Sequence, residues 1–271
     1  VMVNKRQDNL IKISYSKIEI TNDIESLEHN IIRECLKLFN INKSVEISYS
    51  ADLPINSTGT GLGSSSALVV GTILALASYV GDTSYNNPWK LAETAFEIEK
   101  NFINPNVGKQ DHYCAAFGGL NYYTFSSNRV EVVPILIEPE ILKKISNHLY
   151  LFFTQLTRIS NTILEEQAQN AQLKVEKYLE LNKLSETLYL NFRKGKFDLL
   201  PSILNSGWQI KKDLSESISN TSIDEFYERG MEFGASGGKL CGAGGGGFLL
   251  FFIKPEFTKQ VIDSLANLPH E

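Results

Sequence analysis

A short glycine- and serine-rich segment, GTGLGSSSA, runs from Gly59 to Ala67, and an apolar stretch follows it to Val80. Glycine lets the backbone adopt positive φ and approach another group closely. The stretch from Ala67 to Val80 is apolar on all sides, which predicts a buried helix that the serines of the segment open. We therefore expect a loop at a helix N-terminus, where backbone N–H groups lack partners within the helix and favour an anion.

This loop is the first candidate site, and its chemistry suits phosphate. Three glycines permit close approach, the helix start offers N–H donors, and the serine hydroxyls add further donors or a metal ligand. A flexible turn with a serine N-cap is the alternative. The loop is not a Walker A motif, because no Gly-Lys-Ser/Thr closes it, and the chain carries no HRD or DFG signature of protein kinases.

A second glycine cluster, GKLCGAGGGGFLLFF, contains Gly242, Gly244 and Gly247 at the spacing of a dinucleotide fingerprint. That fingerprint follows a strand and opens a helix, whereas this cluster precedes a predicted strand. A tight loop that lets the backbone approach a ligand or another segment fits better. A close-packed loop between two elements, without a ligand, is the alternative.

The predicted helix Pro88 to Phe102 contains one acidic residue on its apolar side. Its apolar arc is formed by Leu91, Ala92, Ala95, Phe96, Ile98 and Phe102. Glu99 falls inside that arc, whereas Glu93 and Glu97 fall on the opposite side and are predicted to be solvated charges. A buried carboxylate needs a cation or a metal, because burying it unpaired is costly. An ion pair with a buried Arg or Lys is the alternative to a metal site.

The run Gly108-Lys109-Gln110-Asp111-His112 begins a predicted short helix that Gly118 and Gly119 end. Asp111 is either a carboxylate favoured by the helix dipole or a base held near a phosphate site. His112 is predicted to be structural, and Lys109 to be exposed.

Composition excludes several classes of protein. The 271 residues carry a net charge of −5, which argues against a general nucleic-acid binder. The three cysteines are scattered singly, which indicates a reduced and cytoplasmic protein. The N-terminus lacks the layout of a signal peptide. The longest apolar stretch, Ala67 to Val80, is shorter than the roughly 20 residues that span a bilayer, so no membrane segment is expected.

Hydrophobic periodicity predicts the order of elements. Strands are expected within residues 1–20 as a hairpin or meander, and then at 45–49, 120–125, 130–136, 149–153 and 248–253. Helices are expected at 24–39, 67–80, 88–102, 161–193 with a break, 199–214, from a capping box at 222–225, and after Pro255. The strand at 149–153 is predicted to be buried. A polar stretch at 139–148 suggests a boundary between domains 1–146 and 147–271.

Together these motifs resemble the GHMP small-molecule kinases, which include galactokinase, homoserine kinase and mevalonate kinase. The resemblance is carried by Gly61 to Ala67, Glu99, Gly108 to Asp111, and Gly242 to Phe248. It implies a two-domain α+β fold. Residues 1–146 would form an ATP-binding domain like domain 2 of ribosomal protein S5, and residues 147–271 a ferredoxin-like domain.

The resemblance also implies roles for individual residues. The phosphates of ATP would bind at Gly59, Gly61, Leu62, Gly63, Ser64, Ser65 and Ser66. Ser65 and Glu99 would hold Mg²⁺, and Asp111 would accept the proton of the attacking hydroxyl. Substrate would contact Lys109, Asp111, Arg158, Gly244, Gly245 and Gly246.

Within the family, residues 108–125 and 151–167 are most similar to the branch of sugar-1-kinases that phosphorylate D-glycero-D-manno-heptose 7-phosphate, and to their fucokinase relatives. This similarity implies ATP- and Mg²⁺-dependent phosphorylation of the anomeric hydroxyl. Arg158 would bind the sugar phosphate, with a surface charge as the alternative. Another GHMP substrate, such as fucose, galactose or mevalonate, and a non-catalytic sensor that binds nucleotide or sugar stay open. A small-molecule partner is expected, without nucleic acid or membrane, and a homo-oligomer stays open.

Members of the family usually begin with a further strand and a glycine-rich loop that contributes to the sugar site. Relatives also continue beyond the last helix into another strand. We therefore expect the printed chain, Val1 to Glu271, to be shorter than its relatives at both ends.

Overall fold

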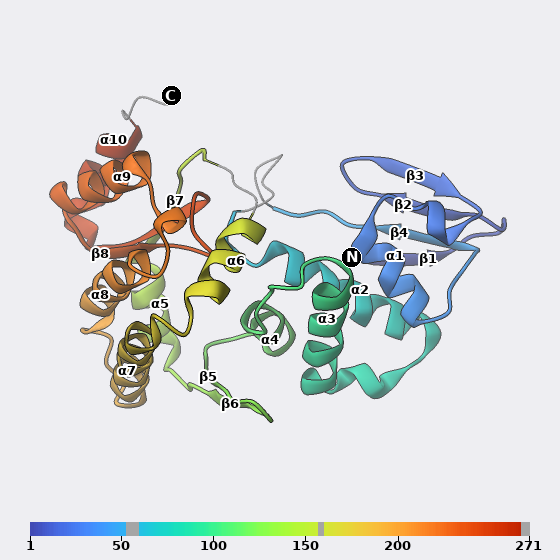
Figure 1. Ribbon diagram of the computed structural model, residues 1–271, viewed down its shortest axis with the longest axis horizontal. Coiled ribbons are helices and arrows are strands. Elements are labelled where there is room, and N and C mark those ends of the chain that lie inside the picture. The colour runs from blue at the N-terminus through green and yellow to red at the C-terminus, as the bar shows by residue number, and fades with distance from the viewer. Residues whose placement is uncertain (53–59, 157–159, 267–271) are drawn as a thin grey trace. The chain divides into compact units, whose positions relative to one another are not determined.

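The computed structural model describes residues 1–52, 60–156 and 160–266, and its chain divides into two compact units (Figure 1). The first unit comprises residues 1–55 and 63–119, and the second comprises 56–62 and 120–271. This division differs from the boundary predicted after residue 146, because β5 (Asn121–Phe125), β6 (Val130–Pro134) and α5 (Pro139–Ser146) group with the second unit. The combination of helices with separate sheets confirms the predicted α+β class.

The sheet of the first unit contains β1 (Met2–Lys5), β4 (Val45–Ser48), β2 (Ile11–Ser14) and β3 (Ile18–Thr21), in that order. β2 and β3 form the predicted antiparallel hairpin. The other predicted arrangement, a meander of the first strands, is wrong, because β4 lies between β1 and β2 and runs parallel to β2. This insertion aligns the buried side chains of β4 with those of β2 on one apolar face.

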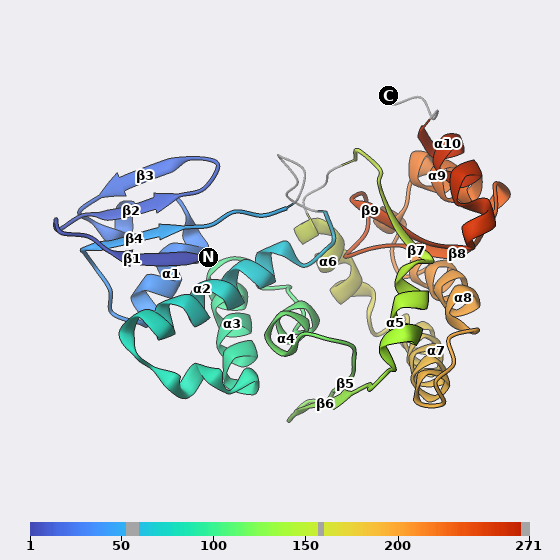
Figure 2. The same ribbon diagram turned by 180° about the vertical axis from the view of Figure 1, so that it is seen from behind.

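Helices cover that apolar face of the first unit (Figures 1 and 2). They are η1 (Ile24–Ser26), α1 (Asn30–Leu38), α2 (Ser64–Val80), η2 (Thr83–Asn86), α3 (Pro88–Phe102) and α4 (Gln110–Phe117). α3 has the predicted bounds, because Asn87 accepts hydrogen bonds from the first N–H groups and Pro88 suits the first turn. α2 is not buried on all sides as predicted, since Leu74 is 39% exposed.

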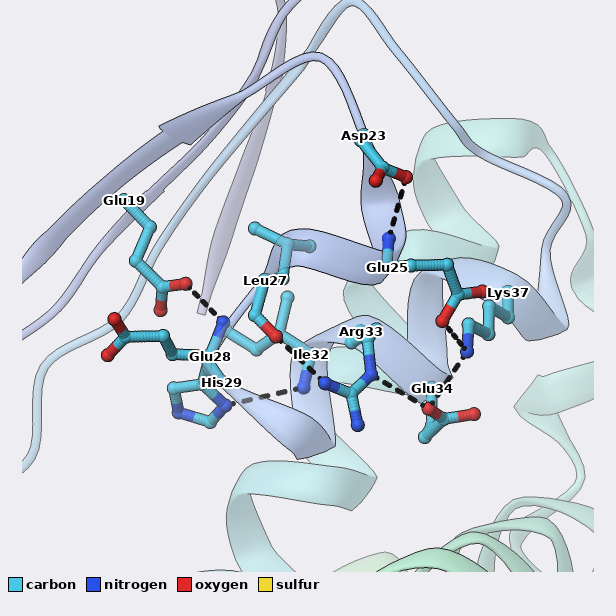
Figure 3. Close-up of polar contacts among 10 residues, drawn as sticks. All are labelled: Glu19, Asp23, Glu25, Leu27, Glu28, His29, Ile32, Arg33, Glu34 and Lys37. Carbon is cyan, nitrogen blue, oxygen red and sulfur yellow. Dashed lines mark hydrogen bonds and ion pairs between the residues drawn. The ribbon is translucent and has the colours of Figure 1, made fainter.

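A polar network fixes the start of α1, as Figure 3 shows. The predicted helix from residue 24 is interrupted, and α1 begins only after His29, whose Nδ1 accepts from the N–H of Ile32 at 3.4 Å. The N–H of the preceding residue, Glu28, donates to Glu19 at 2.6 Å. Arg33 donates to the carbonyl of Leu27 at 2.8 Å. The chain that enters α1 is therefore held by side chains.

The second unit is built on an antiparallel sheet in the order β7 (Leu149–Phe153), β9 (Phe248–Ile253) and β8 (Ala235–Leu240). Its further helices are α6 (Ser160–Asn170), α7 (Val175–Arg193), α8 (Leu200–Lys212), η3 (Glu216–Ile218), α9 (Thr221–Glu232), η4 (Pro255–Phe257) and α10 (Thr258–Ala266). Trp208, Ile218, Tyr227 and Phe251 belong to its core. Figure 2 shows β7 and α5 from the second viewpoint.

Two local predictions for this unit are wrong. The strand β7 is only partly buried, with Leu151 49% exposed, because the more continuously apolar β9 occupies the centre of the sheet. The cap of α9 is Asn220, whose side chain accepts from the N–H of Ile223, so Ser222 lies inside the helix. Asn is as good an N-cap as Ser, and it stands two residues earlier.

Helices of membrane-spanning length and apolarity are not found in the ranges that the structure describes. Cys35, Cys114 and Cys241, which all lie in the described ranges, form no disulfide.

Candidate active site

The start of α2 is uncapped. Its N-cap is Gly63, with φ of 70°, and no side chain of the described residues accepts a hydrogen bond there. The first bond of the helix joins the N–H of Ala67 to the carbonyl of Gly63 at 2.9 Å. The N–H groups of Ser64, Ser65 and Ser66 therefore have no acceptor within the helix. Such a helix end attracts anions through these donors and the helix dipole.

Glu99 lies beside this helix start, because α2, α3 and α4 pack against one another. Its side chain is buried, as predicted, with the residue 5% exposed. Ser65 Oγ donates to Oε1 at 2.7 Å, and Ser66 Oγ donates to Oε2 at 3.0 Å. His112 Nε2 lies 2.7 Å from Oε2. The partners are thus two hydroxyls and an imidazole, rather than the buried Arg or Lys of the alternative interpretation.

The surroundings keep Glu99 charged. Burial raises the pKa of this carboxyl, but the hydrogen bonds from His112, Ser65 and Ser66 outweigh burial and hold the pKa below its ordinary value. An ionised carboxylate beside a helix start that attracts anions suits a divalent cation, which would bind between the carboxylate and a phosphate.

Ser65 and Glu99 fit a Mg²⁺ site that nucleotide phosphates complete. Their oxygens are hard ligands, and Mg²⁺ typically takes one or two carboxylates together with phosphate oxygens. The described ranges hold no group of three or more His, Cys, Asp and Glu side chains arranged for a metal. Ser65 and Glu99 therefore suit a Mg²⁺ site whose remaining ligands would be phosphate oxygens of the nucleotide.

Asp111 lies in the first turn of α4, and its residue is exposed. A Cβ built on Gly63 would lie 3.3 Å from Asp111 Cγ and 3.4 Å from Oδ2. The carboxylate therefore packs against Gly63 at the open start of α2. The structure brings together the predicted base and the predicted phosphate loop, although they are separated by more than 40 residues in the chain.

The contacts of Lys109 and Glu93 contradict the predictions that Lys109 is exposed and that Glu93 is a solvated charge. Lys109 Nζ donates to both carboxylate oxygens of Glu93 at 2.8 Å, and it lies 5.0 Å above the ring of Phe96. Tyr113 also donates to Glu93. Burial raises the pKa of Glu93, but the hydrogen bonds from Lys109 and Tyr113 outweigh burial and hold the pKa below its ordinary value. Lys109 is thus not merely exposed and Glu93 is not merely solvated, because α4 brings them together.

The second glycine cluster forms a turn between β8 and β9 and packs tightly. A Cβ on Gly244 would lie 2.8 Å from the Cα of Ile218, and one on Gly246 would clash with the carbonyl of Leu156. The N–H of Gly245 donates to the carbonyl of Ile218 at 2.8 Å. The three glycines that were predicted to contact substrate are therefore packed closely against other segments, and their contact with substrate stays a prediction.

The same turn also holds the beginning of the phosphate loop. A Cβ on Gly61, where φ is 75°, would lie 2.5 Å from the carbonyl oxygen of Cys241, and one on Gly242 would clash with the Cα of Gly61. The N–H of Phe248 donates to the carbonyl of Thr60 at 3.2 Å. The two glycine motifs therefore meet through their backbones, which no feature of either motif alone predicts.

Of the other residues predicted for the site, Leu62 and Ser64 lie in the described ranges. Leu62 is 37% exposed, and Ser64 is the first residue of α2. Gly59 and Arg158 lie outside the described residues. Sequence reasoning missed His112 as the partner of Glu99. The available signal was that a buried carboxylate needs a partner and that His112 adjoins the predicted base.

The sequence matches the family models for the GHMP kinases N terminal domain over residues 30–119 and for the GHMP kinases C terminal region over residues 188–269. The chain belongs to the GHMP kinase family. A crystal structure of a D-glycero-D-manno-heptose 1-phosphate kinase from Bacteroides thetaiotaomicron is similar in fold, with a TM-score of 0.76 and 23% identity, covering 98% of this chain and 80% of that one.

Two curated relatives are similar in sequence. The chain is 36% identical over 229 residues to the D-glycero-alpha-D-manno-heptose 7-phosphate kinase of Campylobacter jejuni, a match that covers 80% of this chain and 63% of that protein. It is 30% identical over 250 residues to the galactokinase of Thermotoga maritima, covering 79% and 67% of the two chains. The chain thus spans less than two thirds of the length of the heptose phosphate kinase.

Proposed function

We propose that this chain carries the catalytic site of an ATP- and Mg²⁺-dependent kinase that phosphorylates the anomeric hydroxyl of D-glycero-D-manno-heptose 7-phosphate. The observation that carries the proposal is the carboxylate of Asp111 against Gly63 at the uncapped start of α2. Phosphoryl transfer to a hydroxyl needs an anion site, charge neutralisation and a group that positions or deprotonates the nucleophile, all within reach of one another.

The phosphates of ATP bind at the start of α2 in this proposal. The N–H groups of Ser64, Ser65 and Ser66 donate to phosphate oxygens, and the helix dipole favours their negative charge. Gly63 has no side chain that would obstruct the approach of a phosphate. Ser65 Oγ and Glu99 would hold Mg²⁺, which, when bound, neutralises charge on the phosphate oxygens.

Asp111 accepts the proton of the attacking hydroxyl. A bond forms between the anomeric oxygen and the γ-phosphorus, the bond to the β,γ-bridging oxygen breaks, and ADP leaves. Asp111 is an exposed residue, and its carboxylate packs against Gly63 beside the proposed phosphate site. A general base of this kind contributes a factor of about 10² to 10⁴ to the rate.

The choice of sugar rests on the 36% identity to the heptose phosphate kinase. A sugar 7-phosphate needs cationic partners, and Arg158 and Lys109 are the proposed ones, with Gly244, Gly245 and Gly246 as proposed backbone contacts. Because Lys109 already donates to Glu93, Arg158 is the better candidate for the phosphate. We also propose a cytoplasmic location, which is supported by the three described cysteines forming no disulfide.

The test is ATP consumption by the full-length protein with heptose 7-phosphate, the same heptose without phosphate, fucose, galactose and mevalonate. We expect heptose 7-phosphate to give the highest kcat/KM. Arg158→Ala should raise KM for this sugar far more than for ATP, whereas Arg129→Ala, at a position whose side chain is 74% exposed, should change neither. A preference for galactose or fucose would reassign the substrate, and nucleotide binding without turnover on any sugar would indicate a sensor.

A further inference from the structure

The carboxylate of Glu99 is held unequally at its two oxygens. Oε2 accepts from both Ser66 Oγ and His112 Nε2, at 3.0 and 2.7 Å. Oε1 lies 2.7 Å from Ser65 Oγ. The donors on Oε2 are buried, with Ser66 3% and His112 0% exposed, whereas Ser65 is an exposed residue at the start of α2. One carboxylate oxygen is thus held by two buried residues, and the other accepts from a residue that is exposed.

His112 is built to donate to Glu99. Its Nδ1 has no hydrogen-bonding partner among the described residues. A carboxylate oxygen accepts hydrogen bonds, so Nε2, which lies 2.7 Å from Oε2, is the nitrogen that carries a hydrogen toward Glu99. The ring of Phe96 contacts the imidazole edge-on, with the centroids 5.8 Å apart. Packing therefore fixes the donor in direction as well as in distance.

The neighbours of His112 on α4 take other partners. Lys109, the N-cap of α4, and Tyr113 both donate to Glu93, which stands six residues before Glu99 on α3. His112 thus contacts Glu99 from α4. The same helix carries Asp111 at the adjacent position, so one short helix holds both the proposed base and the donor to the proposed metal ligand.

We infer that His112 is a positioning residue, which holds Oε2 of Glu99 so that Oε1 and Ser65 Oγ are presented together to Mg²⁺. This inference rests on the proposed function, because it assigns Glu99 to the metal. A carboxylate that is free to rotate must be ordered when the ion binds, whereas a fixed one is ordered beforehand. Hydrogen-bonding partners of metal ligands typically contribute 10- to 100-fold to metal affinity or activity.

The test compares His112→Leu, which removes the donor, with His112→Gln, whose amide nitrogen can reach the place of Nε2. Mn²⁺, used as a paramagnetic probe for the Mg²⁺ site, is titrated into the full-length protein saturated with adenylyl imidodiphosphate. Electron paramagnetic resonance gives its dissociation constant, and Mg²⁺ titrations of ATP consumption give a second measure. Thermal melting of each variant reports folding, and Glu99→Gln is the control for the metal ligand itself.

We expect His112→Leu to weaken Mn²⁺ binding and raise the Mg²⁺ requirement by about 10- to 100-fold. KM for the sugar at saturating Mg²⁺ should stay unchanged, and His112→Gln should restore most of the Mn²⁺ affinity. A folded His112→Leu with wild-type Mn²⁺ affinity would overturn the inference and leave His112 as a packing residue.

Should His112→Leu fail to fold, His112→Gln and His112→Asn decide the question, because Asn carries the same amide but is too short to reach Glu99. Equal Mn²⁺ affinities in these two variants would overturn the inference, and weaker binding in the Asn variant supports it. An unchanged affinity in Glu99→Gln overturns the metal site and the inference together. Weaker Mn²⁺ binding in Glu99→Gln, together with unchanged Mn²⁺ binding in His112→Leu, would overturn the inference about His112 and leave the metal site in place.

Discussion

Two helices of the first unit begin in opposite ways. At the start of α1, His29 accepts from the N–H of Ile32, and Glu19 accepts from the N–H of Glu28 (Figure 3). At the start of α2, no side chain of the described residues accepts from the helix, and the N-cap is Gly63. One helix start thus has a side-chain cap, and the other has none among the described residues.

The serines make this contrast informative. Serine is among the best N-cap residues, and a cap stabilises a helix by about 1 kcal/mol. α2 begins with three serines, yet the N-cap position is held by Gly63, and Ser65 and Ser66 inside the helix donate their hydroxyls to Glu99. The core packing of α2, through Val69, Ile73 and Leu76, holds the helix without the cap. A helix end that forgoes available caps is where we expect a ligand.

We expect the largest fall in turnover when the proposed base, Asp111, is changed and the uncapped start of α2 is left intact. Asp111→Asn keeps the shape of the side chain but removes its charge and basicity, so kcat should fall by about 10²- to 10⁴-fold. The affinity for ATP should change little, because the start of α2 is intact. Steady-state kinetics and nucleotide titration measure the two quantities.

Asp224, in the first turn of α9, supplies the matched control for a carboxylate at a helix start. Asp224→Asn should leave kcat unchanged. Near-wild-type turnover in Asp111→Asn would remove Asp111 from the proposed mechanism and leave it as a carboxylate favoured by the dipole of α4.

A second pair of variants tests why Gly63 stands at the start of α2. Gly63 has φ of 70° and packs against Asp111, whereas Gly81 has φ of 80° and a Cβ there would have nothing within 4 Å. Replacement by Ala should cost each protein about 1–2 kcal/mol of unfolding free energy, because both positions are left-handed. Only Gly63→Ala displaces the carboxylate of Asp111, so only this variant should lose turnover. Equal kinetics in the two variants would show that the close contact is not used.

A smaller effect, on the pH dependence of stability, is expected from His29, which caps the start of α1. Burial lowers the pKa of His29, although Glu19 acts in the opposite direction. The neutral ring is therefore favoured by folding, so its contribution to stability is fully present above the ordinary pKa of about 6.5 and is lost as the pH falls through the lower folded pKa. Protonation also removes the acceptor at Nδ1 and places a positive charge at a helix N-terminus.

Urea unfolding at pH 7.5 and at pH 5 measures this contribution. Acidification should lower the stability of the wild type by about 1 kcal/mol more than that of His29→Asn, because Asn caps without titrating in this range. Identical pH dependences in the two proteins would contradict a role for His29 as a titrating cap.

The fold was predictable where local chemistry decides it. Pro88 and the cap residue Asn87 define the start of α3, and its apolar arc follows from helical spacing. The position of β4 between β1 and β2 was not predictable, since strand pairing depends on segments distant in the chain. The start of α1 was also missed, because His29 is an unusual cap whose partners, such as Tyr49, come from elsewhere.

The site was predictable to a similar extent. The glycine-serine loop before a helix and the burial of Glu99 follow from one helix at a time. The donation of His112 to Glu99 and that of Lys109 to Glu93 depend on how α4 packs against α3, which no local pattern specifies. The open start of α2 was predicted as an anion site, although the sequence alone also permitted a serine cap.

Hydrogen exchange at the two helix starts measures whether nucleotide binds at the start of α2. Exchange of the N–H groups of Ser64, Ser65 and Ser66 is compared with that of Asn30, Ile31 and Ile32, with and without Mg²⁺ and a non-hydrolysable ATP analogue. We predict that nucleotide slows exchange at the start of α2 and leaves the start of α1 unchanged. Bound nucleotide that leaves exchange at Ser64 to Ser66 unaltered would contradict the assignment of this helix end to the phosphates of ATP.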